Sequence, residues 1–157
     1  MRKKSSKPRV ISPDPKYKSV LVSTFINKIM VDGKKGKARE IFYSTIDKIS
    51  KEIEEVPGLE IFNKAIENLT PSVEVKGRKV GGSSLLIPIE VRERRKSFLS
   101  MRWLITQSRK RTEKTMAERL AKEIIEASKE KGAAYSKKIE LHKSAEAHKA
   151  NAHMALR

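Results

Sequence analysis

The chain has 157 residues, of which 38% are hydrophobic and 35% charged, and it carries a formal net charge of +17 and no cysteine. This length suits one domain with a core of its own, and the lack of cysteine excludes disulfides and cysteine-based zinc or iron–sulfur sites. No apolar run approaches the ~18 residues that span a bilayer, and prolines interrupt the basic N-terminus, so we expect neither a membrane anchor nor a transit peptide.

The positive charge is concentrated in three zones. Residues 1–36 carry ten basic against two acidic residues, and residues 76–114 carry twelve against three. Residues 137–157 add five against two, whereas residues 37–75 are net negative with five against eight. Such zones suit the binding of a partner with dense negative charge, because each phosphate that is neutralised releases condensed counterions.

Hydrophobic periodicity predicts a mainly α-helical fold with a basic N-terminal tail. Residues 1–17 are rich in proline and are expected to be an extension that is extended or disordered when free, and residues 18–157 are expected to form one helical domain. Apolar residues recur at spacings of three and four in about six segments, most of which end at Gly or Pro. The predicted helices are residues 19–32, 37–56, 59–70, 92–108, 115–131 and 136–154. Glu118 lies three residues after Thr115, which predicts a capping box at the start of the fifth helix.

Between residues 72 and 91 apolar residues recur at every second position, in two runs that alternate apolar and polar residues on either side of Gly81-Gly82. This predicts a β-hairpin, or ribbon, with a long basic tip over residues 76–84. We expect the apolar residues of its two strands to share the face that docks on the helices. Because a two-stranded ribbon is at best marginally stable alone, it should protrude from the helical body. The last helix has a poor apolar side and should be steadied by a partner.

Signatures of catalysis and metal binding are missing from the sequence. The histidines at 142, 148 and 153 are spaced six and five apart, which is not a metal-ligand spacing on a helix. The Gly33-Lys34-Lys35-Gly36 turn lacks the spacing of a nucleotide-binding P-loop and fits a contact to a phosphate backbone better. We therefore expect no enzyme activity, no cofactor and no metal site.

Arginines dominate the fourth predicted helix. Arg95, Arg102 and Arg109 recur every seven residues, on a face predicted to be separate from the apolar side that includes Phe98. Arginine suits bidentate phosphate contacts and stacking better than lysine does, so a nucleic-acid surface is favoured over a merely solvated face. Trp103 borders this face and is either the rim of the core or a surface for base stacking.

Four stretches carry a family resemblance. They include Ser19-x-Leu-x-x-x-Phe-Ile with Gly33-Lys-Lys, Val73-Glu-Val-Lys with Gly81-Gly82, Ile87-Pro-Ile-Glu-Val-Arg92 with Leu99-x-Met-Arg-Trp103, and Glu113-Lys-Thr-Met-Ala-Glu-Arg-Leu120. In this order, over nearly the whole chain, they resemble the small-subunit ribosomal protein number seven family in its bacterial form. A helical DNA-binding or nucleoid-type protein is the alternative that composition alone leaves open.

The resemblance implies a structural protein of the ribosome in the cytoplasm, with an organellar ribosome left open. Its implied partners are the 3′ major (head) domain of 16S rRNA, whose assembly it would begin, the nearby exit-site tRNA and mRNA, and other small-subunit proteins, notably the eleventh. No membrane or small-molecule partner is implied.

Charge and resemblance together give the candidate residues. The RNA-binding candidates are Arg2, Lys3, Lys4, Arg9, Gly33, Lys34, Lys35, Lys76, Arg78, Lys79, Arg92, Arg95, Lys96, Arg102, Arg109, Arg111, Lys114, Met116, Lys143 and Lys149. The ribbon tip that the resemblance implies near the exit site comprises Arg78, Lys79, Val80, Gly81, Gly82, Ser83 and Ser84.

Overall fold

The computed structural model describes residues 9–156, apart from the side chains of Val80, Ser83 and residues 154–156. The chain divides into two compact units, Met1–Glu40 and Ile41–Arg157. Their boundary falls within the second helix, α2 (Lys35–Glu52). The predicted division into an extension over residues 1–17 and a domain over residues 18–157 stays a prediction.

The first unit contains a turn that Asp14 anchors. The buried Asp14 carboxylate accepts hydrogen bonds from the backbone N–H groups of Lys16 and Tyr17, at 3.1 and 3.2 Å. Helix α1 (Val20–Ile29) follows this turn. The part of the tail next to α1 is therefore folded into a hydrogen-bonded turn, where the sequence predicted an extended or disordered segment.

The apolar stripe predicted for the first helix is confirmed. The buried residues of α1 include Val22, Phe25, Ile26 and Ile29, which lie three and four positions apart. Helix α2 begins at Lys35, two residues before its predicted start, so Gly36 lies inside its first turn.

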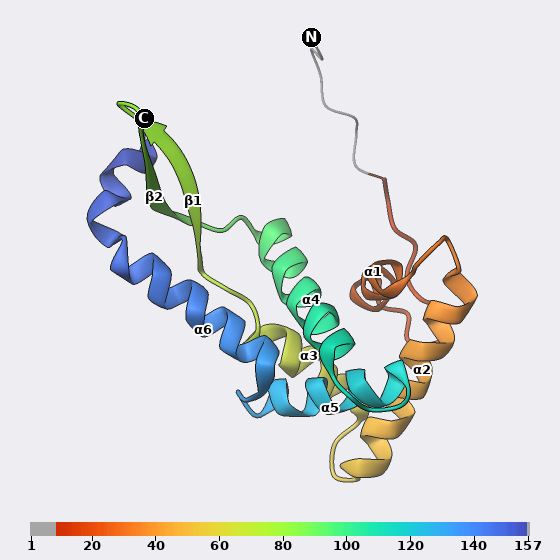
Figure 1. The fold of residues 1–157 in the computed structure, drawn as a ribbon. Helices are drawn as coiled ribbons and strands as arrows, with labels where there is room; N and C mark the ends of the chain where they lie inside the picture. Colours follow the sequence, from red (N-terminus) through yellow and green to blue (C-terminus); the bar gives the residue numbers. More distant parts are fainter. Residues whose placement is uncertain (1–8, 157) are drawn as a thin grey trace. The chain divides into compact units, whose positions relative to one another are not determined.

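Three further helices build the body of the second unit: α3 (Gly58–Asn68), α4 (Glu93–Lys110) and α5 (Met116–Ser128). Phe42 and Phe62 pack edge to face at the centre of this body, with ring centroids 5.3 Å apart, and both side chains are fully buried. α5 packs on α3 and on α4, as Figure 1 shows. The predicted mainly α-helical fold with a hairpin is confirmed.

Strands β1 (Val73–Val80) and β2 (Ser83–Glu90) form the antiparallel ribbon. Gly81 and Gly82, with φ angles of 57° and 87°, make the two-residue turn, which fits the type I′ turn that joins twisted strands. The long basic tip predicted over residues 76–84 is therefore wrong, because both strands stay paired up to this turn.

The register of the ribbon also corrects the predicted docking face. Val75 lies opposite Pro88, and Ile87 lies opposite Lys76. Directly opposed residues share a face and the face alternates along a strand, so the valines of β1 and the isoleucines of β2 lie on opposite faces. The ribbon thus has apolar residues on both faces.

The C-terminal segment lies along the ribbon. α6 (Gly132–Ala147) packs on both strands and the 3₁₀ helix η1 (Lys149–Leu156) packs on β2, beside the green ribbon in Figure 1. The Asn151 side-chain amide donates to the backbone carbonyl of Leu86 at 3.0 Å. The single helix predicted over residues 136–154 is wrong at both ends, since α6 starts earlier and stops before η1.

Candidate nucleic-acid interface

The ribbon presents three of the candidate cations. Lys76, Arg78 and Lys79 lie on β1 and are exposed. Since side chains alternate along a strand, Lys76 and Arg78 lie on one face and Lys79 on the other. The ribbon therefore carries positive charge on both faces.

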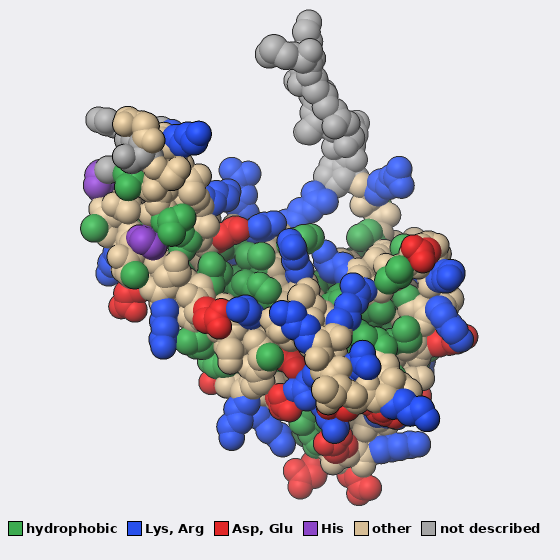
Figure 2. Space-filling model, viewed as in Figure 1, with side chains coloured by type: hydrophobic (Ala, Val, Ile, Leu, Met, Phe, Trp, Pro, Cys, Tyr) green, Lys and Arg blue, Asp and Glu red, His purple; other side chains and the backbone are tan. Residues whose placement is uncertain are grey.

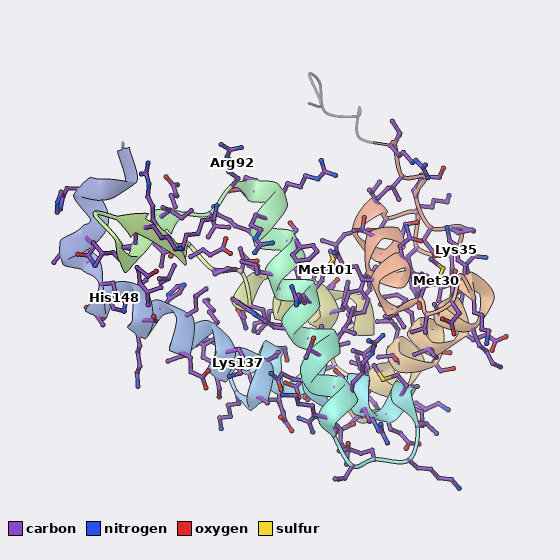
Figure 3. All side chains as sticks on the ribbon, turned by 45° about the horizontal axis from the view of Figure 1, so that its top comes forward. Met30, Lys35, Arg92, Met101, Lys137 and His148 are labelled. Atoms are coloured by element: carbon purple, nitrogen blue, oxygen red, sulfur yellow. The ribbon has the colours of Figure 1, made fainter. Side chains whose placement is uncertain are left out.

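Helix α4 carries the second group of cations. Arg92, its N-cap, is exposed, and so are Arg102 and Arg109. Figure 3 labels Arg92 where the chain leaves the ribbon and enters α4, and Met101 further along the same helix. Helix α4 is continuous from Glu93 to Lys110, so Arg95, Arg102 and Arg109, which are seven residues apart, lie on one side of it.

Arg95 differs from these residues because it is bound to the ribbon. Its Nη2 donates to Glu74 Oε1 at 2.7 Å and its Nε to Glu74 Oε2 at 3.2 Å. This hydrogen bond lowers the pKa of Glu74 and raises the pKa of Arg95. Arg95 therefore ties α4 to β1, a structural role that the sequence did not indicate.

Phe98 also departs from its predicted place. Its ring is half-buried and lies under two guanidinium groups, with Arg95 Cζ 5.2 Å and Arg102 Cζ 6.0 Å from the ring centroid. These are cation–π distances. The prediction that Arg95 and Arg102 share a face separate from Phe98 is therefore wrong. The buried side of α4 is formed by Leu99, Met101, Leu104 and Ile105.

Lys96 has a local carboxylate partner as well. Its Nζ lies 2.5 Å from Oε1 of Glu93, one turn earlier in the helix, and its side chain is only 21% exposed. Both residues lie in the first turns of α4, and the ion pair between them reduces the positive charge that Lys96 offers to a phosphate.

Arg111 is engaged inside the protein. Its guanidinium pairs with Glu123 (Nε to Oε2, 2.7 Å), with Glu126, and with Glu113 (Nη1 to Oε1, 3.5 Å). Burial acts to lower the pKa of Arg111, but hydrogen bonds to Glu123 and Glu126 outweigh it and raise the pKa. The charge of Arg111 is therefore compensated inside the protein, which indicates a structural role.

Glu123 is the residue that sequence reasoning missed. It is fully buried, and its Oε1 accepts the Ala134 backbone N–H at 2.7 Å. One carboxylate thus joins the loop at Arg111, helix α5 and the first turn of α6. A signal was present in the sequence, because Glu123 lies three and four residues from Leu120 and Ala127 on the apolar stripe of α5.

The loop before α5 positions Lys114 and Met116. Lys114 is exposed and Met116 half-buried. The Thr115 hydroxyl accepts from the backbone N–H of Glu118 while the Glu118 carboxylate accepts from that of Thr115, both at 3.3 Å. The predicted capping box is confirmed, and it fixes the backbone beside Lys114.

Three candidates of the first unit, Gly33, Lys34 and Lys35, lie at the turn between α1 and α2. Gly33 has a φ angle of +72°, a conformation that favours glycine, and open space around its α-carbon. Lys34 and Lys35 are exposed beside it, and Arg9 is exposed at the start of the described chain. Arg2, Lys3 and Lys4 lie outside the described residues.

The third basic zone is sparse. Lys143 on α6 and Lys149 on η1 are exposed, and His148, at the end of α6, is half-buried and labelled in Figure 3. Burial and the nearby Lys138 lower the pKa of His142. These positions offer charge near the ribbon but less of it than α4.

Trp103 is half-buried, which leaves both interpretations of its role open. Among residues 9–156, no three His, Asp or Glu side chains gather as metal ligands would. In the same range, no helix combines the length and apolar character that a membrane span requires.

The geometry brings Lys76 of the ribbon together with Arg92 and Arg95 at the junction of the ribbon and α4, whereas Arg78 and Lys79 lie near the turn of the ribbon and Arg109 lies in the last turn of α4. In Figure 2, Lys and Arg side chains gather over this junction with a few carboxylates among them. Exposed guanidinium and ammonium groups on a rigid helix and a paired ribbon suit contacts to the phosphates of a nucleic acid.

The comparisons with known proteins agree with this chemistry. The family model of ribosomal protein S7p/S5e matches residues 1–149. The small ribosomal subunit protein uS7 of Sulfurimonas denitrificans is 51% identical over 153 residues, covering 98% of each chain. The proteins of that name from Nitratiruptor and Mycoplasmoides gallisepticum are 48% and 49% identical, covering at least 98% of each chain. Such proteins are structural components of the ribosome and not enzymes, and the chain belongs to the ribosomal protein S7p/S5e family.

Proposed function

We propose that the chain is a structural component of the small ribosomal subunit that binds the 3′ major (head) domain of 16S rRNA and begins the assembly of that domain. The observation that carries this proposal is the pair of exposed basic groups on β1 and α4, in a chain of the S7p/S5e family. The relatives named above are small-subunit proteins, which favours rRNA over DNA as the partner.

The charge distribution supports binding through the phosphate backbone. Residues 76–114 carry twelve basic against three acidic residues, and all of these basic residues except Lys96 and Arg111 are exposed. Log affinity should therefore fall steeply with log salt concentration, by up to about 0.9 for each phosphate that is neutralised.

The test is the equilibrium affinity of the full chain for a head-domain fragment of 16S rRNA over a range of salt concentrations. The double variant Arg102→Ala/Arg109→Ala should bind more weakly and show a shallower salt dependence. Lys64→Ala removes an exposed cation from α3, far along the sequence from the basic groups, and should bind as the wild type does. Equal affinity for the fragment and for duplex DNA of the same length would favour the DNA-binding alternative.

A finer part of the proposal concerns position in the ribosome. We propose that the end of the ribbon, with Arg78, Lys79 and the Gly81-Gly82 turn, lies near the exit-site tRNA and mRNA, and that the C-terminal segment adjoins the eleventh small-subunit protein. The tight turn and the exposed charges support a reach beyond the body of the protein.

Arg78→Ala/Lys79→Ala tests this position without altering the turn. The variant should fold and bind head-domain rRNA more weakly than the wild type, but it should still enter small subunits, because α4 keeps its arginines. Retention of exit-site tRNA should fall. Subunits that carry the variant and retain this tRNA as the wild type does would contradict the placement.

A further inference from the structure

A hollow of about 660 Å³ lies where the ribbon meets the start of α4. Its lining includes Glu74, Lys76, Ile89, Val91, Arg92 and Arg95. This volume falls within the range of ordinary ligand sites. The lining combines cations, a carboxylate and apolar side chains, which is more than a phosphate contact requires. Such a lining suits a ligand in which a negatively charged group lies next to a flat ring that has polar atoms along its edge.

Arg95 is held in one orientation at this hollow. Its guanidinium forms two hydrogen bonds with Glu74, at 2.7 and 3.2 Å, and lies over the Phe98 ring with Cζ 5.2 Å from the centroid. The Arg95 side chain is nonetheless 45% exposed. A guanidinium that two hydrogen bonds fix along one edge and that stays partly exposed offers a flat stacking surface, which is how arginine holds unpaired bases in RNA.

The carboxylates of the hollow supply hydrogen-bond acceptors. Glu74 is 14% exposed and ionised, since the hydrogen bond from Arg95 lowers its pKa, and each carboxylate oxygen has a second acceptor position. Glu90, also in the lining, is exposed. The exocyclic amino groups of adenine, cytosine and guanine donate to such oxygens, whereas uracil has no amino group.

We propose that this hollow binds one unpaired nucleotide of RNA, with its base stacked on Arg95 and its exocyclic amino group donating a hydrogen bond to Glu74 or Glu90. Lys76 and Arg92 contact the flanking phosphates. Glu74 is then a positioning residue for Arg95 as well as an acceptor. The inference rests on the proposed function, because the nucleotide belongs to the rRNA that α4 and the ribbon contact.

Arg95→Lys tests the stacking contact, because lysine keeps the charge and loses the flat guanidinium. The full-length variant and the wild type are titrated against the head-domain fragment, and each complex is probed with dimethyl sulfate and kethoxal at the Watson–Crick edges of A, C and G. We expect roughly tenfold weaker binding for the loss of one stacked base, an unchanged salt slope, and renewed reactivity of one unpaired base. The matched control is Arg94→Lys, an exposed arginine on the same turn that does not line the hollow; it should bind within about twofold of the wild type.

Ile89→Trp provides a second test, because it fills the hollow without changing its charge. Thermal unfolding shows whether this variant is folded. If it is folded, the same base should regain reactivity toward the probe. If it is not folded, the Arg95→Lys variant alone tests the inference. The inference is overturned if Arg95→Lys binds as tightly as the wild type, or if it binds more weakly while every base stays protected, since arginine would then contact only the backbone. A wild-type chain that does not bind the fragment overturns the proposed function itself, which is a different result.

Discussion

Replacing Arg111 by alanine should destabilise the fold, although Arg111 looks like an RNA-binding residue in the sequence. The side chain is 19% exposed and contacts three carboxylates, of which Glu123 is completely buried. Without Arg111, Glu123 would keep one hydrogen bond, from the Ala134 backbone N–H. Breaking a buried ion pair by removing one partner costs about 3–5 kcal/mol. For a chain of this size that corresponds to a decrease in Tm of roughly 6–20 °C.

The assay is thermal unfolding monitored by circular dichroism at pH 7, with Lys110→Ala as the control because Lys110 is exposed and directly precedes Arg111. The control should change stability by less than about 0.5 kcal/mol. Arg111→Ala/Glu123→Gln should recover much of the loss, since the double variant has no unpaired buried charge. If Arg111→Ala melts with the wild type while its affinity for head-domain rRNA falls, Arg111 is an RNA contact and the reasoning is refuted.

Three further variants or conditions probe the core, the start of α6 and the histidines. Phe62→Ala should cost about 3–5 kcal/mol in denaturant unfolding, because the ring is fully buried; a loss under 1 kcal/mol would contradict that packing. Gly132→Ala should lower Tm, because φ is +88° and a Cβ would lie 2.8 Å from a carboxylate oxygen of Glu126; an unchanged Tm would show that this turn relaxes. Burial and the charge of Lys138 lower the pKa of His142, so the folded state binds a proton at His142 less readily than the unfolded state does. The contribution of neutral His142 to the free energy of unfolding is therefore complete above pH ~6.5 and is lost as the pH falls toward the lowered pKa. His142→Gln should therefore lose less stability than the wild type between pH 7 and pH 5.

Local signals in the sequence were enough for most of the helices. The stripe of α1 and the capping box of Thr115 and Glu118 involve residues within one or two turns of each other, and both were confirmed. The hairpin was also predicted, but its register was not, because Gly81-Gly82 is compatible with loops of several lengths and the sequence does not show which residues pair.

Contacts between distant residues account for the errors. α6 begins at Gly132 because Glu123, from α5, accepts the N–H of Ala134. Arg95 and Arg111 belong to the same arginine-rich stretch as the exposed Arg109, and the sequence does not show the carboxylates that they contact, which lie 21 and 12 residues away. Periodicity assigns a charged residue to a face but does not show which carboxylate that face meets.

A hydroxyl-radical footprint of the full chain on complete 16S rRNA tests the central claim most directly. Salt is held at a concentration where binding is specific, and the double variant Arg102→Ala/Arg109→Ala serves as the comparison. The account predicts protections confined to the 3′ major domain, with a subset lost in the variant. Protections scattered over other domains, or a footprint that the variant leaves intact, would contradict the assignment of the ribbon and α4 as the surface that binds head-domain rRNA.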